Sequence, residues 1–339
     1  MKILCVRLSA IGDLVVTTPV YRALARQLGA EVHALTNRVP AQVLAHNPHV
    51  ARIHDYAASD VVERLRAERF DLLVDLHCNL RSHRLRLRLG LPALGYRKRN
   101  LEKRLLSHGV DVLGDEHLVD RYFRALAPLG VHDDGEGLDY FLHADDWPAA
   151  DHPSAARLAR LRTRPHAAIV LAATHSTKRM PPELVADLLG ALPVPAALLG
   201  AADVRGLADE VLALSGRDDT VDLVDALPLR ASIAVLAEAA GVISPDTGLM
   251  HAAAALRRPL VVVWGNTAPP YGMYPYLPAA QRQLAAYAQV EGLDCRPCSR
   301  IGYPACPRGH FACMRRQTGA SIAEAFARVT ASAIASAQR

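Results

Sequence analysis

The sequence of 339 residues is poor in aromatic side chains, which make up 5% of it, and it has no apolar stretch long enough to cross a bilayer. The apolar run within residues 1–7 is too short for the core of a secretory signal peptide. We therefore expect a cytoplasmic protein. In that compartment its six cysteines should be free thiols or metal ligands instead of disulfides. Contents of 51% hydrophobic and 22% charged residues exclude the disordered class.

Two motifs of common enzyme classes are also absent. Residues 9–13, which follow the first apolar run, lack the Gly-x-Gly-x-x-Gly pattern, so a dinucleotide-dependent oxidoreductase is poorly supported. No Asp-x-Asp pair stands at the end of a predicted strand in a position to hold a catalytic metal, and Asp145-Asp146 lies in polar connecting sequence. These absences turn attention to the charge pattern and to the turns between elements.

Positive charge is concentrated in one segment. The net charge is +5 (39 Lys and Arg minus 34 Asp and Glu), yet residues 81–104 alone hold nine Lys or Arg and a single acid, Glu102. Such a patch indicates a local anionic partner, because a general polyanion binder would be basic throughout. A solvated charged face is the alternative. Residues 84–89 also alternate basic and apolar side chains, so helix and strand both remain open there.

Short apolar runs alternate with helical patterns along most of the chain. The alternation predicts an α/β protein with doubly wound parallel sheets, since strands buried on both faces are apolar throughout. The chain is too long for one ordinary core, and the pattern restarts near residue 160. We predict domains at residues 1–158 and 159–318, and a C-terminal helix at residues 319–339 whose apolar stripe packs back on the first domain. The predicted strands are residues 3–8, 31–35, 52–56, 72–76, 139–142, 166–173, 195–199, 221–224, 239–243 and 260–264, and one long helix is predicted over residues 14–28.

Residues 243–251 join a predicted buried strand to a helix. Thr247 stands at the N-cap position, and Gly248 has no Cβ, so a ligand could approach the backbone closely. Free amides and the positive end of the helix dipole would meet there, which suits a phosphate. An ordinary strand-to-helix turn is the alternative, and this stretch alone does not decide between them.

Three further polar side chains follow predicted strands, where ligands bind in open α/β sheets. Asp13 could accept a proton from a hydroxyl nucleophile, or it could cap the following helix. Lys178 lies in a hydroxyl-rich basic loop and could neutralise charge on a departing phosphate, although such a loop could also be solvated surface. Asp203 could hold a ribose hydroxyl or act as an N-cap.

Together these motifs resemble the ADP-heptose:lipopolysaccharide heptosyltransferases of glycosyltransferase family 9. The likeness rests on residues 8–13 (Leu-Ser-Ala-Ile-Gly-Asp), the Thr177-Lys178 loop, residues 246–254 (Asp-Thr-Gly-Leu-Met-His-Ala-Ala-Ala) and residues 265–269 (Gly-Asn-Thr-Ala-Pro). It implies a GT-B fold, in which two Rossmann-like domains face each other across a cleft, the first for the acceptor and the second for the nucleotide sugar. It also implies an inverting sugar transfer that is independent of metal ions.

The resemblance further implies roles for individual residues. Asp13 would be the general base, and Lys178 would bind the diphosphate during catalysis. The donor would contact Thr177, Asp203, Asp246, Thr247, Gly248, Leu249 and His251, with the backbone of residues 247–249 as a cradle. The acceptor, an anionic glycolipid at the inner leaflet, would contact Gly12, Arg81, Arg84 and Arg97.

The chain departs from the family pattern at two places. Met180 stands where the family usually has tryptophan. A cysteine-rich segment is absent from the best-known heptosyltransferases; its first pair has zinc-knuckle spacing and its second does not, while His310 offers a fifth candidate ligand. The four cysteines are Cys295, Cys298, Cys306 and Cys313. A structural zinc and reduced thiols that pack a loop both remain open, and no cofactor is expected for catalysis itself.

We therefore expect a glycosyltransferase that moves a heptose from a nucleotide-diphosphate donor to a lipopolysaccharide-type acceptor, peripherally associated with the inner face of the cytoplasmic membrane. A nucleotide-sugar epimerase on the same architecture is one alternative, and it would turn over donor with no acceptor present. A zinc-dependent nucleic-acid-binding module is another. Its basic and cysteine-rich segments would lie in different halves of the chain, and stacking aromatics are scarce, so we expect no nucleic-acid partner.

Overall fold

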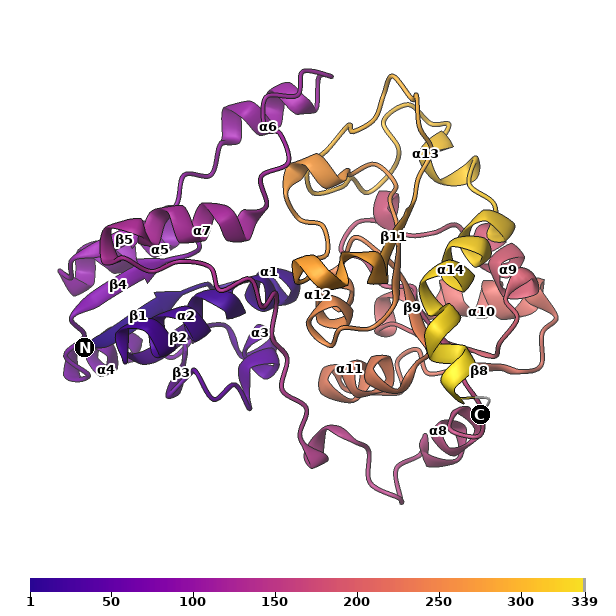
Figure 1. The fold of residues 1–339 in the computed structure, drawn as a ribbon, viewed down its shortest axis with the longest axis horizontal. Helices are drawn as coiled ribbons and strands as arrows, with labels where there is room; N and C mark the ends of the chain where they lie inside the picture. Colours follow the sequence, from indigo (N-terminus) through magenta and orange to yellow (C-terminus); the bar gives the residue numbers. More distant parts are fainter. Residues whose placement is uncertain (338–339) are drawn as a thin grey trace.

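The computed structural model describes residues 1–337, with side chains as far as residue 331, and shows two parallel β-sheets flanked by helices (Figure 1). The first sheet has the strand order β3-β2-β1-β4-β5, and the second has β11-β10-β9-β6-β7-β8. The strands are β1 Lys2–Val6, β2 Glu31–Thr36, β3 Arg52–Asp55, β4 Leu72–Asp75, β5 Ala93–Gly95, β6 Ala167–Val170, β7 Ala196–Leu199, β8 Thr220–Asp222, β9 Gly241–Pro245, β10 Leu260–Val263 and β11 Ala285–Ala288. The predicted α/β class with parallel sheets is confirmed.

Fourteen α-helices lie in the described part of the chain. In the first domain they are α1 Ile11–Val16, α2 Thr18–Leu28, α3 Arg38–Ala41, α4 Val61–Ala67, α5 Leu80–Leu89, α6 Asn100–Leu106 and α7 Leu118–Leu126. The others are α8 Ala155–Leu161, α9 Pro182–Ala191, α10 Arg205–Ser215, α11 Leu229–Glu238, α12 Gly248–Ala255, α13 Ala312–Arg315 and α14 Gly319–Ala337.

Each central strand is buried on both faces, as the continuous apolar runs predict. In β1, Ile3 and Cys5 belong to one hydrophobic core, whereas Leu4 and Val6 belong to a second core on the other side of the sheet. All four side chains are fully buried. Alternate side chains of a strand point to opposite faces, so a strand between two helical layers must be apolar at every position.

The chain order reverses at one point in each sheet, between β1 and β4 and between β6 and β9. At such switch points the loops after neighbouring strands diverge and leave a crevice at the carboxyl ends. β1 leads into α1, and β9 leads into α12. These two helices contact each other at the centre of the molecule, where the domains meet (Figure 1). The fold thus brings two ligand-binding edges together.

The helix predicted over residues 14–28 is two helices. α1 ends at Val16, and α2 starts at Thr18 with Pro19 in its first turn. Proline has no backbone N–H and cannot continue an i→i−4 ladder, so the chain restarts there. Gly12 and Asp13, which precede the predicted helix, lie in the first turn of α1.

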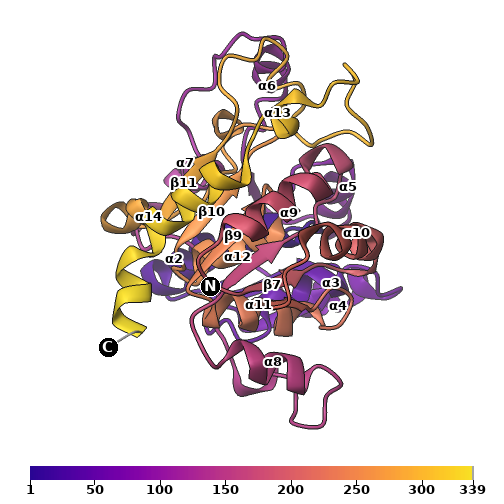
Figure 2. The same cartoon turned by 90° about the vertical axis from the view of Figure 1, so that its right-hand side faces the viewer.

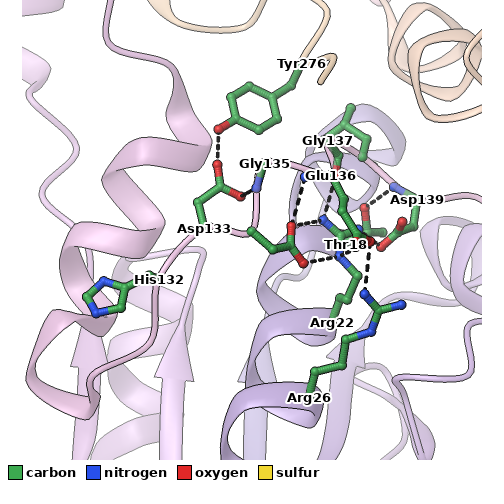
Figure 3. Close-up of polar contacts among 12 residues, drawn as sticks. Thr18, Arg22, Arg26, His132, Asp133, Gly135, Glu136, Gly137, Asp139 and Tyr276 are labelled. Carbon is green, nitrogen blue, oxygen red and sulfur yellow. Dashed lines mark hydrogen bonds and ion pairs between the residues drawn. The ribbon is translucent and has the colours of Figure 1, made fainter. Parts of the chain in front are cut away.

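A segment between the domains is held by a buried arginine. Arg22 of α2 is 1% exposed, and it pairs with Asp134 at 2.7 Å and with Asp139. Its Nη2 also donates to the carbonyl oxygen of Gly137 at 2.9 Å (Figure 3). A buried guanidinium needs such partners, because an unpaired charge away from water is strongly destabilising. Arg22 therefore fixes the path of the chain as it leaves the first domain.

The strand predicted at residues 139–142 is wrong. This stretch has no regular secondary structure and pairs with neither sheet. Its first N–H, that of Asp139, donates to Thr18 Oγ1 at 2.8 Å instead of to a neighbouring strand. On the other side of the segment, the hydroxyl of Tyr276 from the second domain donates to Asp133 (Figure 3).

Two predictions about domain organisation are also wrong. The boundary expected between residues 158 and 159 falls inside α8, which packs against β8 of the second sheet. The C-terminal helix α14 packs on α9, β9, β10 and β11 of the second domain, not on the first domain (Figures 1 and 2). Its Phe326 is fully buried beside Gly241, where a Cβ would lie 2.8 Å from the Phe326 ring. Residues 338–339 of that prediction lie outside the described residues.

Within residues 1–337, no helix combines the length and the apolarity that a membrane-spanning segment requires.

Candidate active site

A cavity of about 420 Å³ lies where the two switch points meet, a volume typical of small-molecule sites. Five cationic side chains and two carboxylates line it, a net charge of +3 (five minus two), so it favours an anionic ligand. The cations are Arg7, Lys98, Lys103, Lys178 and Arg300, and the carboxylates are Asp13 and Asp246. Seven of the predicted site residues line this cavity: Gly12, Asp13, Lys178, Asp246, Thr247, Gly248 and His251.

Asp13 caps α1 and also lines the cavity, so its capping contact leaves it accessible to a ligand. Its Oδ2 accepts the backbone N–H of Ala10 at 3.1 Å, as a helix-capping carboxylate does, and it pairs with Arg7 Nη2 at 2.5 Å. Oδ1 has no hydrogen-bond partner among residues 1–337. Arg7 is itself held by the carbonyl oxygens of Ser9 at 2.8 Å and Leu76 at 2.7 Å. One carboxylate oxygen is thus fixed in place, and the other is available to a ligand.

The surroundings of Asp13 keep it ionised. Burial alone would raise its pKa, but the charge of Arg7, the Ala10 amide and the hydrogen bond from Arg7 outweigh burial and lower the pKa below its usual range. At neutral pH the group is a carboxylate and can accept a proton. Its hydrogen-bond donor, the Ala10 N–H, and its charge partner, Arg7, both come from the segment between β1 and α1.

Lys178 and Asp246 form an ion pair on the second-domain wall. Their Nζ and Oδ2 atoms are 2.7 Å apart, and both side chains are largely buried. Lys178 follows β6, whereas Asp246 follows β9, so the pair spans the second switch point. Thr247 occupies the N-cap position of α12 as predicted, but its side chain makes no capping hydrogen bond. The first amides of α12 are therefore available to an anion beside Lys178.

Gly12 and Gly248 bring the two domains into backbone contact. A Cβ on Gly248 would lie 3.0 Å from the Gly12 nitrogen and 3.0 Å from Ile11 Cγ2. A Cβ on Gly12 would lie 2.9 Å from His251 Cδ2. The sequence led us to expect a ligand against Gly248. The structure shows instead that α1 of the first domain occupies that space.

His251 is buried on the cavity wall and neutral. Burial is the main cause that lowers its pKa to about 4, with the charge of Lys178 acting in the same direction. Its Nδ1 has no hydrogen-bond partner among the described residues, and the same holds for buried atoms of three other wall residues, His77 Nδ1, Trp264 Nε1 and Thr267 Oγ1. Unpaired buried polar atoms are rare in folded proteins, so several on one cavity wall mark positions where solvent or a bound ligand supplies the partners.

Sequence reasoning missed several cavity residues. Lys98 and Lys103 both lie in the basic segment, in which the sequence predicts Arg97 as an acceptor contact, and Arg300 comes from the cysteine-rich segment. Burial, with the charges of Arg121 and Arg300, lowers the pKa of Lys103 to about 8. In the structure, buried Tyr96 and half-buried Lys98 flank exposed Arg97, and no local sequence pattern distinguishes Lys98 from its basic neighbours.

Six predicted site residues do not line the cavity. Thr177 is buried and bonds to the backbone of Tyr303, Asp203 pairs with Arg179 at 2.5 Å, and Leu249 packs against the core. The three predicted acceptor arginines, Arg81, Arg84 and Arg97, are exposed, the first two on α5 and the third beside Glu102. The side chains at these six positions are exposed, paired with other residues or packed outside the cavity. Met180 is also buried in the second-domain core, so its departure from the family pattern alters packing and not the cavity wall.

The cysteine-rich segment forms a separate small cavity. It is lined by Cys295, Cys298, Cys306, Cys313 and His310, next to Thr177 and Asn266. Burial, with the neighbouring Cys298 and Cys306, raises the pKa of Cys313 to about 11. A thiol in this setting stays protonated unless a cation balances its charge.

A second cluster of metal-ligand residue types has its donors already engaged. The ligand atoms of His33, His54 and Glu68 lie within 4.8 Å of one another. Glu68, however, pairs with Lys2 and Arg52, and the two imidazoles bond to each other at 2.9 Å. These contacts account for the cluster as a charge network of the first domain.

The chain matches one protein-family model and is similar in fold to several solved structures. The family model "Glycosyltransferase family 9 (heptosyltransferase)" matches residues 59–297. Among solved structures, the chain is similar to a glycosyl transferase family 9 protein from Veillonella parvula DSM 2008, with 17% identity, a TM-score of 0.75 and 97% of each chain covered. It is also similar to E. coli ADP-heptose lps heptosyltransferase II (19% identity, TM-score 0.70, 98% of this chain and 99% of that chain) and to E. coli heptosyltransferase WaaC with ADP (21% identity, TM-score 0.65, 96% and 98%). A search of curated proteins gave no match.

Proposed function

The chain belongs to glycosyltransferase family 9, and we propose that it transfers a heptose from an ADP-linked donor to an anionic glycolipid acceptor, with inversion at the anomeric carbon. Its two facing α/β domains have the GT-B fold of the heptosyltransferase structures. The observation that carries the proposal is that Asp13 from one domain and the Lys178–Asp246 pair from the other line the same cationic cavity.

In the proposed reaction, Asp13 is the general base. The acceptor hydroxyl gives its proton to the free Oδ1 of Asp13 as its oxygen forms a bond to the anomeric carbon. The bond from that carbon to the diphosphate oxygen breaks on the opposite face, and the nucleoside diphosphate leaves with the electron pair. Lys178 and the first amides of α12 stabilise the negative charge that develops on the leaving oxygen. Because these groups supply the positive charge, the proposed step requires no catalytic metal ion.

Asp246 would position Lys178 for this task. A lysine ammonium is a compact charge on a flexible stem, and the 2.7 Å pair with Asp246 restricts where it points. His251 and Thr267 carry unpaired buried polar atoms on the same wall, so they would contact the phosphates or the ribose of the donor. The choice of ADP over other nucleotides rests on the names of the similar structures.

The acceptor would bind on the side of the first domain. Lys98 and Lys103 line the cavity there and suit the phosphates of a charged glycolipid. Outside the cavity, Leu80 and Leu87 of α5 and Leu101 of α6 are between 66% and 69% exposed, among the arginines of the same helices. Exposed leucines beside basic side chains suit the surface of an anionic leaflet, so we propose that α5 and α6 hold the enzyme peripherally at the membrane that carries its acceptor.

A ligand screen with matched variants tests the donor assignment. ADP-, GDP- and UDP-sugars are added to the purified protein, and its thermal unfolding is followed. A nucleotide sugar at about 100 times its Kd stabilises the fold by about 2.7 kcal/mol. We expect an ADP-sugar to do so for the wild type and for R179A, whose arginine pairs with Asp203 outside the cavity, but not for K178A. No stabilisation by any of the sugars would refute the donor site.

The same preparation separates the transferase from the epimerase. The family match favours the glycosyltransferase over both the epimerase and the nucleic-acid-binding module. A transferase releases ADP only when an acceptor is supplied, apart from slow hydrolysis. Conversion of the donor sugar to an epimer without acceptor would overturn the proposed reaction while leaving the donor site intact.

A further inference from the structure

The cysteine-rich segment encloses a space of the size of one ion. Cys295, Cys298, Cys306 and Cys313 line a cavity of about 10 Å³, which is roughly the space that a single water-sized sphere occupies. All four are free thiols. The remaining two cysteines of the chain, Cys5 and Cys78, lie in the first domain, in β1 and just after β4. The clustering thus sets these four apart from the other thiols.

We propose that these four thiolates bind one thiophilic divalent metal ion, Zn²⁺ or Fe²⁺, and that this metal holds Arg300 at the wall of the active cavity. Four sulfur ligands in a closed site are the donor set that tetrahedral Zn²⁺ and Fe²⁺ prefer. The metal site rests on the four cysteines that line one small cavity, whereas the role of Arg300 in acceptor binding rests on the proposed function.

His310 is a hydrogen-bond donor to the site and not a fifth ligand. Its Nδ1 accepts the backbone N–H of Ala312 at 2.9 Å, so in the neutral ring the proton is on Nε2. That Nε2 lies 3.8 Å from Cys295 Sγ. It can therefore donate to the Cys295 thiolate and stabilise its charge, as partners outside the ligand shell do at other metal sites.

Metal binding would tighten the segment. In a tetrahedral zinc site with Zn–S bonds of about 2.3 Å, neighbouring sulfurs are about 3.8 Å apart. Among the described residues, no three of the cysteine sulfurs are within 4.8 Å of one another. The ligands must therefore approach to bind the metal, and the loop between Cys298 and Cys306 moves with them.

That loop connects the cysteine cluster to the active cavity. The turn at residues 299–302 is closed by Ser299, whose Oγ accepts the N–H groups of Ile301 at 3.2 Å and Gly302 at 3.0 Å. Tyr303 then exchanges hydrogen bonds with Thr177, at 2.8 Å from its N–H to Thr177 Oγ1 and at 3.0 Å in return to its carbonyl oxygen. The loop is thus tied to the residue next to Lys178.

Arg300 is carried by this turn across to the first domain. It lines the active cavity, and its Nη1 donates to Asn100 Oδ1 of α6 at 2.9 Å. Lys103, also of α6, lines the same cavity. Arg300 therefore acts as a positioning contact between the metal-bound loop and the helix that we assign to the acceptor.

Metal analysis of the purified full-length protein tests the site independently of activity. We expect about one Zn²⁺ or Fe²⁺ per chain, and elemental analysis identifies which of the two is bound. The double variant C298S/C306S should lose the metal, while C78S, a control thiol outside the cluster, should retain it. Because the double variant could fail to fold, wild-type protein stripped by a chelator is also titrated with Co²⁺, whose tetrahedral thiolate complexes absorb visible light. No metal in the wild type, together with no cobalt–thiolate absorption, would overturn the site.

Two further readouts test the link to Arg300. Backbone hydrogen exchange at residues 299–303 should be faster in the stripped protein than in the loaded one, whether or not sugar transfer is measured. In a transfer assay, stripping the metal and the variant R300A should each raise the acceptor KM about tenfold, and the two together should raise it no further. Unchanged exchange and an unchanged KM after stripping would refute the positioning role and leave the metal site standing.

Discussion

The contact between Gly12 and Gly248 makes a strong prediction about the variant G12A. A Cβ at residue 12 would lie 2.9 Å from His251 Cδ2 and 3.0 Å from the Gly248 Cα, where ordinary contacts are 3.4 to 4 Å. The imidazole can turn aside, but the Gly248 backbone is the first turn of α12. The extra methyl must therefore push α1 and α12 apart, and with them the two walls of the cavity.

The expected loss of stability is small, and the expected loss of activity is large. Overpacking of this kind costs about 1–3 kcal/mol. Alanine in a helix regains about 1 kcal/mol relative to glycine, so the net free energy of unfolding should fall by about 0–2 kcal/mol. A displacement of about 1 Å between reacting groups can cost about 100-fold in rate. We therefore expect kcat/KM to fall by about 10–100-fold.

A matched control separates the two effects. Gly206 is also helical, in α10, but nothing lies within 4 Å of a Cβ built there. G206A should keep full activity and should be neutral or slightly stabilising in urea denaturation. If G12A transferred sugar at the wild-type rate, the approach of α1 to α12 would not set the catalytic geometry, and our account of the two walls would be refuted.

Three further predictions concern other parts of the molecule. Since Arg7 holds the pKa of Asp13 below its usual value, the acid limb of the kcat/KM profile should lie below about pH 4 and should move to higher pH by about 1–3 units in R7Q; an unmoved limb would exclude Asp13 as the titrating base. F326A should lower the free energy of unfolding by about 3–5 kcal/mol because Phe326 is fully buried on the second domain, and a calorimetric trace in which only the first domain is destabilised would contradict this packing. K103A should raise the KM of a soluble acceptor about tenfold, whereas R84A, on the exposed face of α5, should leave it unchanged; equal effects of the two would contradict the acceptor site.

The spacing of apolar residues in the sequence predicted most strands and helices, but it gave a weak signal for some strands at the sheet edges. β1, β2, β4 and β10 lie within one or two residues of their predicted places, because each is a short, mostly apolar run whose residues are mostly buried. Two edge strands, β5 and β11, gave no such signal. β11 is Ala-Ala-Tyr-Ala, which is neither alternating nor rich in β-branched residues, and β5 is three residues long.

The apolar face of an amphipathic helix does not by itself determine which part of the protein the helix packs on. The stripe of α14 correctly indicated that Ile322 and Phe326 are buried, but a hydrophobic face specifies only that it will be covered. What places α14 on the second sheet is the match to Gly241, whose lack of a Cβ admits the Phe326 ring, and the bond from the Gly319 N–H to Asp187 Oδ2 at 2.5 Å. Both partners are distant in sequence, so no local pattern could find them.

The residues of the candidate site also fall into those that the sequence predicts and those that it does not. Positions tied to strand ends were found, because topology alone carries Asp13, Lys178 and His251 to the crevice. The sequence did not predict which side chains of helices and loops point into the cavity. Lys103 and Arg300 come from a helix and a loop that reach over the cavity from opposite domains, and their convergence depends on long-range packing.

The central claim is that Asp13 removes the proton of the acceptor while the donor binds elsewhere, and D13N tests it most directly. The amide oxygen of asparagine can accept the same bonds from Ala10 and Arg7 that Oδ2 accepts, so the fold should persist while the basic oxygen is replaced by an N–H donor. Measured side by side, donor Kd should match the wild type and single-turnover transfer should be slower by about 100–10,000-fold. Transfer at the wild-type rate, or a loss of donor binding equal to the loss of rate, would contradict the account.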